Sequence, residues 1–474
     1  MKTYLFYDVE TSGLNPAFDQ ILAFASIRTD IEFNEIERNS VVIQLRPDVV
    51  PSPQAFIIHR LGFNDLKTGL PEYEAAKKIH KIFNKPGTVS LGYNTLRFDD
   101  EFLRFLFYRN LLDPYTHQYN KGCSRMDMLP LSTLFYIFNP GIISWPENNG
   151  KPSFKLENIS KENSLTKSGR AHEAMTDVEA TYNLTKIFAK DHEVFNYSID
   201  FFNKAKDDLR ISKFKNSFDL MGQPFKLGIM VSHQLGFDNK YMAMVINIGK
   251  SLKYSNQNLW LRLDKENILD FTLNPEESMT LLVRKRYGDL PIILPAIDRF
   301  YGKLIDENIK IAENNLKEIT NHSNDFYKII KFHQEFKYPF IPDLDPDAAL
   351  YQSGFFNQNE KKDISAFHGA DLIDKIKIAE QMSSERIKVL AKRIMQRNCP
   401  SDMLKSSNSE FDEFRRLMNK IRLSGSESRI KGFKNDTKLN CKDALKELKD
   451  TLASDLDNEQ KEILNWLQEY IKKM

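Results

Sequence analysis

Apolar residues follow two different spacings over the first 190 residues of the chain. Short continuous apolar runs, typical of buried strands, predict strands at residues 4–7, 20–30, 41–46 and 88–93. Apolar residues three and four positions apart predict helices at residues 73–83, 99–108 and 174–190. Strands and helices that alternate in this way are typical of an α/β domain, and we expect a mixed sheet.

The spacing changes twice further along the chain. Short β-type segments separated by turn residues occur at 227–232, 242–249, 258–263 and 279–286, and a helical segment follows at 302–320. This pattern predicts a small β-rich, barrel-like domain. After a proline-containing stretch at 338–350, helical spacing continues at 364–397, 409–423 and 441–473. We therefore expect three domains, at residues 1–192, 193–346 and 347–474.

Length and composition agree with several soluble domains. A chain of 474 residues is too long for one ordinary core, and 41% hydrophobic with 28% charged residues is a globular balance. The net charge of +2 neither supports nor excludes a nucleic-acid partner, because a polyanion is bound by local positive potential. Cys123, Cys399 and Cys441 lie far apart and form no CxxC pair, so neither a zinc cluster nor a disulfide framework is expected.

The N-terminal segment does not have the pattern of a signal peptide. Asp8 and Glu10 interrupt it before any apolar stretch of the required length. A run of about 18 apolar residues, as a membrane helix needs, does not occur. We expect a cytoplasmic protein that does not enter a membrane.

Asp8 and Glu10 follow the first predicted strand, in the sequence FYDVETSG. Residues i and i+2 of a strand point to the same side, so both carboxylates are expected to face one space at the C-terminal end of this strand. Two acids beside a loop can also be simply solvated, and a DxE pair often occurs by chance.

Asp99 and Asp100 open a predicted helix after the strand and turn LGYNTLRF. Acids in the first turn of a helix are favoured by the helix dipole and by capping, which accounts fully for Asp100. Asp99 directly follows Phe98, whose ring is expected to anchor the turn and hold the carboxylate inward.

The third acidic motif is RAHEAMTDVEAT, in which His172 precedes a helix and Asp177 lies about a turn and a half inside it. Neighbours such as Met175 and Val178 are expected to pack this helix, so Asp177 is harder to explain as a capping residue. His172 taken alone is also compatible with an ordinary surface histidine.

The four carboxylates come from three segments, each at the edge of a predicted element, and can converge on one point. Clusters of carboxylate oxygens suit Mg²⁺ or Mn²⁺. Two such cations can activate water and stabilise the leaving oxygen in phosphodiester hydrolysis. A histidine nearby can take the proton of that water, because its ordinary pKa is close to neutral pH.

These motifs, DxE, YNxxxFD and HxxxxD, resemble the histidine-bearing branch of the DEDD exonuclease superfamily. The resemblance implies an RNase H-like exonuclease domain that binds two Mg²⁺ ions, with Mn²⁺ able to substitute. It implies that Asp8, Glu10, Asp99 and Asp177 are the ligands and that His172 is the general base. All five positions are filled as the family pattern expects.

Longer stretches are similar to the bacterial exonuclease I family, notably SLGYNTLRFDDEFLRFLFYRNLLDPY, WPENNGKPSFKLENIS and LYQSGFF. The length and the order exonuclease domain, SH3-like domain, helical domain also fit that family. The resemblance implies a monomer that degrades single-stranded DNA from its 3′ end to 5′-mononucleotides, in DNA repair and recombination. It also implies a channel closed by the second and third domains, and contact with single-stranded DNA-binding protein.

Substrate contacts are expected from Glu10, Asn94, Phe98 and Lys155. Lys155 stands where the family tends to have an arginine, so the charge is kept but the planar fork is lost. Residues 381–438, which include Arg393 and Arg397, hold 14 Lys or Arg against 7 Asp or Glu. This stretch is either a solvated helical face or a phosphate-tracking wall of the channel.

Two other functions remain open from the sequence. An RNA-directed exonuclease of the same superfamily would use identical chemistry, so the five site residues do not discriminate DNA from RNA. A non-catalytic module that binds single strands is the alternative from another class. The intact acidic set argues against it, since four clustered acids gain nothing when phosphates are bound without a metal.

Overall fold

The computed structural model describes the chain except for residues 168, 171, 267, 269–278, 399–411 and 423–428. Its first sheet has the strand order β3-β2-β1-β4-β5. These strands are β1 (Thr3–Thr11), β2 (Ile21–Thr29), β3 (Glu35–Val42), β4 (Thr88–Gly92) and β5 (Ser124–Asp127). β1 pairs antiparallel with β2 and parallel with β4, so the predicted mixed sheet is confirmed.

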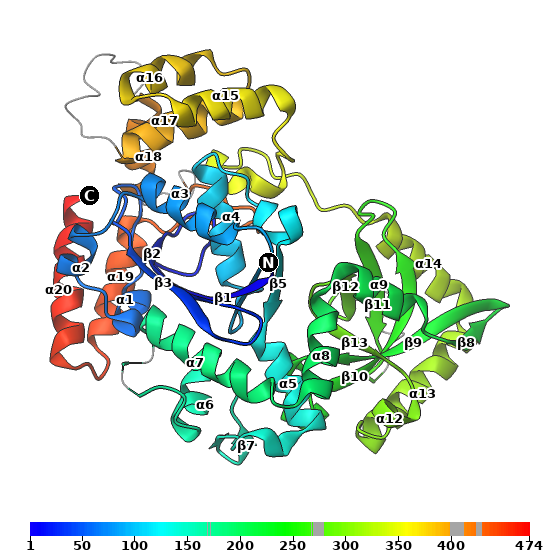
Figure 1. Ribbon diagram of the computed structural model, residues 1–474. Coiled ribbons are helices and arrows are strands. Elements are labelled where there is room, and N and C mark those ends of the chain that lie inside the picture. Colours follow the sequence, from blue (N-terminus) through cyan, green and yellow to red (C-terminus); the bar gives the residue numbers. More distant parts are fainter. Residues whose placement is uncertain (168, 171, 267, 269–278, 399–411, 423–428) are drawn as a thin grey trace.

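Helices α3 (Glu72–Phe83) and α4 (Asp99–Arg109) cover one face of this sheet and α7 (Ala174–Phe188) covers the other (Figure 1). The remaining helices of this region are α1 (Pro53–His59), α2 (Phe63–Lys67), α5 (Met128–Phe138), α6 (Leu156–Glu162) and α8 (His192–Ile199). Successive residues of a strand face opposite sides. Leu5 and Tyr7 of β1 therefore lie in one cluster with α3 and α4, whereas Tyr4 and Phe6 lie in the cluster that contains α7.

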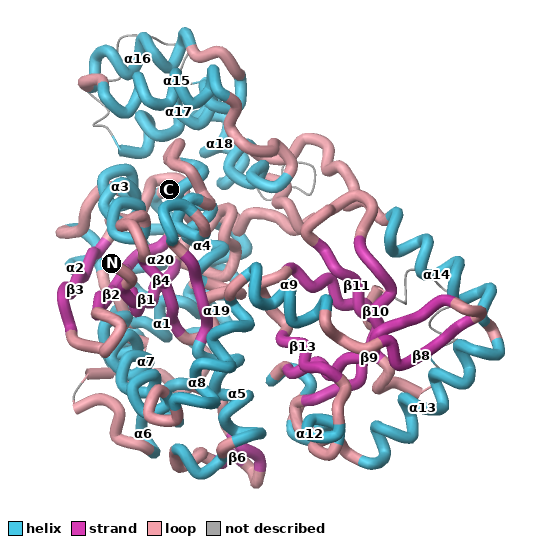
Figure 2. Tube along the Cα trace, turned by 45° about the vertical axis from the view of Figure 1, so that its right-hand side comes forward, coloured by secondary structure: helices cyan, strands magenta, loops and turns pink. Residues whose placement is uncertain are grey.

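A second, antiparallel sheet follows in the chain, with the strand order β12-β11-β10-β9-β13 and β8 paired to β9 (Figure 2). Its strands are β8 (Asn216–Leu220), β9 (Gln223–Val231), β10 (Met242–Lys250), β11 (Gln257–Arg262), β12 (Leu282–Arg286) and β13 (Ile292–Pro295). The accompanying helices are α9 (Lys204–Ser212), α12 (Asp298–Tyr301), α13 (Asp306–Asn321) and α14 (Ser323–Glu335). A short hairpin, β6 (Glu147–Asn148) with β7 (Lys151–Pro152), stands apart from both sheets.

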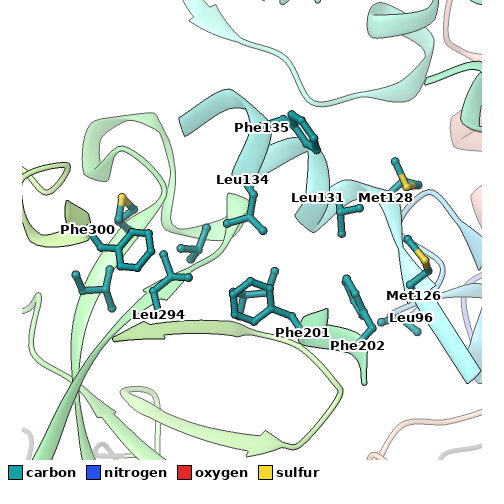
Figure 3. Close-up of a cluster of buried hydrophobic side chains, with 14 of the residues drawn as sticks. Leu96, Met126, Met128, Leu131, Leu134, Phe135, Phe201, Phe202, Leu294 and Phe300 are labelled. Carbon is teal, nitrogen blue, oxygen red and sulfur yellow. The ribbon is translucent and has the colours of Figure 1, made fainter. Parts of the chain in front are cut away.

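An apolar interface joins the two sheet regions (Figure 3). Leu131 and Leu134 of α5 lie in one buried cluster with Leu294 of β13 and with Phe201 and Phe202, which belong to a short turn of helix between α8 and α9. A shared buried core of this kind fixes the second sheet against the first domain.

The C-terminal helices form two groups, one above the first sheet and one along its flank (Figure 1). They are α15 (Gln358–Gly369), α16 (Leu372–Gln381), α17 (Glu385–Asn398), α18 (Asp412–Arg422), α19 (Cys441–Leu452) and α20 (Asn458–Lys473). α19 and α20 pack against α1, burying Leu448, Leu464 and Leu467 together with Phe56 and Leu66. The expected fold class is therefore confirmed, while the domain limits 192 and 346 stay predictions.

A buried ionic network connects the flanks of the first sheet to the C-terminal helices. Arg397 of α17 donates to Asp48 at 2.7 Å, and both side chains are almost fully buried. Glu72, at the start of α3, accepts hydrogen bonds from Arg46 at 2.9 Å and from Arg109 at 3.1 Å. Buried charges of this kind are tolerated because every one of them has a partner of opposite charge.

Several expected elements are wrong in detail. The strand expected at 41–46 is β3, which ends at Val42, since alternate residues of this edge strand are exposed and give no apolar run. The helix expected at 364–397 is three helices, interrupted where Asp371 caps α16 and again before Glu385. The start of the segment expected at 409–423 lies outside the described residues, as does Cys399.

The basic interpretation of residues 381–438 is wrong for its two central arginines. Arg393 is 2% exposed and pairs with Asp345 and Asp347, and Arg397 pairs with Asp48 and Asp347. These side chains hold the helices together and do not line a channel. Among the described helices, none combines the length and apolar character needed to cross a membrane.

Candidate active site

Asp8 and Glu10 lie within β1 and not in a loop after it, because the strand continues to Thr11. They occupy the strand face that begins with Tyr4 and Phe6, where α7 packs. Their partners across β2 are Ala25 and Ala23, so small side chains leave room beside the carboxylates. The pairing is irregular between Glu10 and Thr11, a local bulge of the kind often found next to active sites.

Asp99 and Asp177 reach this face from two helices. Asp99 opens α4, and its Oδ1 accepts a hydrogen bond of 3.1 Å from the backbone N–H of Val9, between the two acids of β1. Asp177 lies in the first turn of α7. Ligand oxygens of Asp8, Glu10 and Asp177 lie within 4.8 Å of one another. The structure therefore brings three of the four predicted acids together and places Asp99 next to them on the backbone of β1.

The four carboxylates disfavour one another's charge. Burial raises the pKa of Asp8 well above its usual range, and the charges of Asp99, Glu10 and Asp177 raise it further. Burial and the neighbouring acids raise the pKa of Glu10 to about 9, and burial raises that of Asp99 to about 8 and that of Asp177 to about 6. Such a group becomes fully ionised only when positive charge enters it.

The acidic cluster fits divalent cations. Its donor atoms are carboxylate oxygens alone, which is the ligand type that hard cations such as Mg²⁺, Mn²⁺ and Ca²⁺ prefer. A bound cation would relieve the electrostatic repulsion between these carboxylates. The structure thus supports a divalent-metal site at Asp8, Glu10 and Asp177, with Asp99 beside it.

His172 lies at the edge of the cluster. Its backbone N–H donates to Asp177 Oδ2 at 3.3 Å, and its backbone φ of 62° lies in the left-handed region. Its imidazole Nε2 is 3.2 Å from Glu157 Oε2, and the side chain is 49% exposed. The sequence prediction missed Glu157, because a glutamate in the first turn of α6 has an ordinary explanation in the helix dipole.

The other expected substrate residues lie around this edge. Lys155 is 72% exposed and lies 3.5 Å from the same Glu157, so its ammonium group can reach a ligand. Asn94 is exposed, with a φ of 65°, and its backbone N–H donates to Asp127. Phe98 is half-buried and packs on Phe102, with ring centroids 4.9 Å apart, which anchors the turn before Asp99 as expected.

Asp100 has a structural role that capping alone does not explain. It is fully buried and accepts a hydrogen bond of 3.0 Å from the hydroxyl of Tyr7, the residue before Asp8. It also pairs with Arg125 of β5, which in turn pairs with Asp289 at 3.0 Å, close to the second sheet. Burial raises the pKa of Asp100, but Arg125 and Arg104 outweigh burial and hold it below the usual value. Asp99 and Asp100 are adjacent in sequence, but burial and nearby acids raise the pKa of Asp99, whereas the arginines beside Asp100 lower its pKa.

Comparison with known proteins gives the same class of protein. The family model described as Exonuclease matches residues 5–185, and the model described as Exonuclease I C-terminal domain matches residues 344–474. Fold and site thus define an exonuclease, a hydrolase of phosphodiester bonds.

The chain belongs to the exodeoxyribonuclease I family. It is 31% identical over 428 residues to exodeoxyribonuclease I of Buchnera aphidicola (subspecies Baizongia pistaciae), covering 86% of each chain. It is 41% identical over 210 residues to exodeoxyribonuclease I of Escherichia coli K12, a match that spans 43% of this chain and 44% of that enzyme.

Solved structures of Escherichia coli exonuclease I are similar over the whole chain. The complex of that enzyme with a dA16 oligonucleotide superposes with a TM-score of 0.82 at 26% identity, covering 100% of both chains. The zinc-bound form of its complex with single-stranded DNA superposes with a TM-score of 0.82 at 26% identity, covering 100% of this chain and 99% of that one.

Proposed function

We propose that this protein is a 3′→5′ exonuclease that hydrolyses single-stranded DNA to 5′-mononucleotides. The observation that carries the proposal is the convergence of Asp8, Glu10 and Asp177 within 4.8 Å, with Asp99 hydrogen-bonded to the strand between the first two. Relatives named exodeoxyribonuclease I, and the similarity to an exonuclease I bound to DNA oligonucleotides, support DNA as the substrate.

The four acids are proposed to hold two Mg²⁺ ions, with Mn²⁺ able to substitute. When bound, such ions neutralise the charge that develops on the transferred phosphate and lower the pKa of water. Asp8, Glu10 and Asp177 have oxygens close enough to share a cation, and Asp99 keeps one oxygen free of its hydrogen bond to Val9. Glu10, Asn94, Phe98 and Lys155 are proposed to contact the terminal nucleotide and its phosphate.

His172 is proposed as the general base that takes the proton of the attacking water at its Nε2. In the structure this atom lies 3.2 Å from Glu157, which can orient the ring and stabilise it once the proton has moved. The short segment that precedes α7 thus provides both the base and, through its backbone N–H, a contact that fixes Asp177. The imidazole is half exposed, so the proton can pass on to solvent.

The proposal is tested by digesting single- and double-stranded DNA labelled at the 3′ or 5′ end, with Mg²⁺ and then with EDTA. Expected is early loss of the 3′ label from the single strand, no early loss of the 5′ label, and no reaction in EDTA. A matched RNA oligomer is included. If RNA is cleaved as fast as DNA or faster, the proposal that DNA is the substrate is wrong.

Asp177→Ala distinguishes catalysis from binding. Expected is loss of Mg²⁺-dependent hydrolysis with single-strand binding in EDTA largely intact. Glu179→Gln is the matched control, because it removes a carboxylate of the same helix that pairs with Arg38 outside the acidic cluster. Equal hydrolysis by wild type and Asp177→Ala would show that the site is wrongly assigned and would favour a non-catalytic module.

The proposal also covers the cellular role, location and partners of the protein. A role in DNA repair and recombination, a cytoplasmic location, a monomeric state and contact with single-stranded DNA-binding protein are proposed from the family. Sedimentation of the purified protein, with and without that partner protein, tests the last two. A stable dimer would overturn the monomer, and a failure to co-sediment would overturn the contact.

A further inference from the structure

A small, partly open pocket lies where the first domain meets the second sheet. Its polar lining consists of Asn94, Arg97, Ser232 and His233. The remainder is apolar, from the start of α5, the end of β9 and the loop before β13. Both domains contribute polar groups, so the pocket exists only in the assembled chain. So small a pocket fits one polar group of a longer ligand and not a whole nucleotide.

The polar groups of this pocket have unused hydrogen-bonding capacity. Within the described part of the chain, the Arg97 guanidinium makes no hydrogen bond or ion pair, and neither do the side chains of Asn94 and His233. Arg97 and His233 line the same small pocket from the two sides of the domain boundary. Burial, followed by the positive charge of Arg97, lowers the pKa of His233. Unpaired donors that converge on one space are suited to an anion.

The acids nearest the pocket are committed elsewhere. Asp127 accepts hydrogen bonds from the backbone N–H groups of Asn94, Leu96 and Leu129 at 2.8 to 3.0 Å. Asp289 pairs with Arg125. None of the described residues that line the pocket is acidic. Burial lowers the pKa of Arg97, and the charges of Asp127 and Asp289 offset this only in part, so its charge is not fully neutralised by a paired acid.

The walls of the pocket are held by apolar packing. Leu96, next to Arg97, belongs to the buried cluster that also contains Leu131 of α5, Phe202 and Leu294 of β13 (Figure 3). The backbone of the turn is fixed as well, by its hydrogen bonds to Asp127. The arginine and the histidine are thus presented from rigid supports, which reduces the cost of binding.

The pocket lies at the same edge of the first sheet as the acidic cluster. β1, β4 and β5 are parallel, so their C-terminal ends share one edge, and neighbouring strands are about 4.8 Å apart. Asp8 and Glu10 are near the end of β1, and Arg97 is on the turn after β4, two residues before Asp99. A strand that leaves the cluster along this edge passes the pocket within a few nucleotides.

We propose that Arg97 and His233 form a phosphate subsite that holds the single strand a few nucleotides from its 3′ end. The ligand chemistry is a phosphodiester, bound by the guanidinium with the imidazole and the hydroxyl of Ser232 as further donors. The apolar residues around the pocket would lie beside the attached sugar. This inference rests on the proposed function and adds a binding site at the junction of the two domains.

Binding of a fluorescent oligothymidylate in EDTA tests the subsite without hydrolysis. Arg97→Ala is expected to weaken binding about 10- to 100-fold, the usual effect of one charge-assisted hydrogen bond. It should also reduce the slope of log affinity against log salt by about 0.7, the value for one phosphate contact on a single strand. Arg97→Lys should keep the slope, and His233→Ala should weaken binding about 2- to 10-fold.

The position of the contact is tested with oligonucleotides that carry one neutral methylphosphonate at successive sites from the 3′ end. Wild type should lose affinity at one or two neighbouring sites, and Arg97→Ala should show no further loss there. Arg299→Ala, an exposed arginine of α12, is the charge-matched control and should keep the wild-type profile. An unchanged profile and salt slope in Arg97→Ala would overturn the subsite.

Two further outcomes separate the possible failures. If Arg97→Ala keeps the methylphosphonate profile but abolishes inhibition by a 5′-mononucleotide, the pocket binds free product and the proposed strand contact is wrong. If wild-type protein binds no single strand at all, the proposed function fails together with this subsite. If wild type binds and degrades DNA while Arg97→Ala behaves identically, only the subsite fails.

Discussion

Substituting Asp99 by Asn is predicted to stabilise the metal-free protein while it removes activity. The Asp99 side chain is 4% exposed, and burial raises its pKa to about 8. Asn is isosteric and its carbonyl oxygen can still accept the hydrogen bond from Val9, so the substitution removes the charge with little change of shape.

The magnitude follows from linkage between ionisation and folding. In the unfolded chain an aspartate titrates near pH 3.9, and each pH unit between the two pKa values costs about 1.4 kcal/mol. At pH 7 the folded wild type is thus destabilised by roughly 4 kcal/mol at most. Because the neighbouring acids share this cost, we expect a gain of about 1–4 kcal/mol for Asp99→Asn. Wild type and variant should be equally stable below pH 4 and diverge as pH rises towards 8.

The assay is urea unfolding at pH 7 in EDTA and again in Mg²⁺. Bound cations should stabilise wild type and stabilise Asp99→Asn much less. Asp100→Asn is the matched control, and it is expected to lower the free energy of unfolding. It removes the fully buried one of the two acids that pair with Arg125, leaving only Asp289, and should cost about 3 kcal/mol.

The reasoning is refuted if Asp99→Asn is no more stable than wild type in EDTA, or if it gains as much stability from Mg²⁺. Equal losses in Asp99→Asn and Asp100→Asn would mean that both acids serve the fold alone. Full hydrolytic activity in Asp99→Asn would show that Asp99 is not part of the active site.

Two more outcomes are expected. His172→Ala should reduce the rate of hydrolysis about 10²- to 10⁴-fold, the range for a positioned proton acceptor, with oligonucleotide binding in EDTA unchanged; a shift in Mg²⁺ affinity at an unchanged rate would instead indicate a structural role. Glu72→Gln should lower the free energy of unfolding by roughly 3 kcal/mol at pH 7, because Arg109 and Arg46 outweigh burial and hold the pKa of Glu72 at about 2. That contribution is present above pH 4.5 and lost as pH falls to 2, so urea midpoints of the two proteins should converge in acid; identical midpoints at pH 7 would contradict it.

The sequence was most informative where one physical constraint fixed the pattern. β1 is buried on both faces, which produces the apolar run Tyr4–Tyr7, and its two-residue period correctly placed Asp8 and Glu10 on one side. α3 and α7 have clear helical spacing and begin close to where they were predicted. The acidic cluster could therefore be predicted before the fold was known.

Elements determined by distant contacts could not be predicted. β5 has only four residues, Ser124–Asp127, and carries Arg125, whose charge is satisfied by residues far along the chain. Arg393 and Arg397 have the composition of an exposed basic face. Their partners are acids on other segments of the chain, Asp48, Asp345, Asp347 and Glu413, and local spacing carries no information on such pairs. The pocket at Arg97 and His233 is likewise formed only when two domains meet.

The packing of α19 and α20 on the first domain has a consequence for synthesis of the chain. Leu66 and Phe56 are covered by Leu448, Leu464 and Leu467, so this apolar flank stays open until the last helix leaves the ribosome. At the usual speed of translation, the roughly 400 residues between Leu66 and Leu464 take about 20–80 s to make. During that interval the first domain exposes this apolar surface, to which chaperones can bind. A messenger truncated before α20 would yield an aggregation-prone product and not a smaller working nuclease.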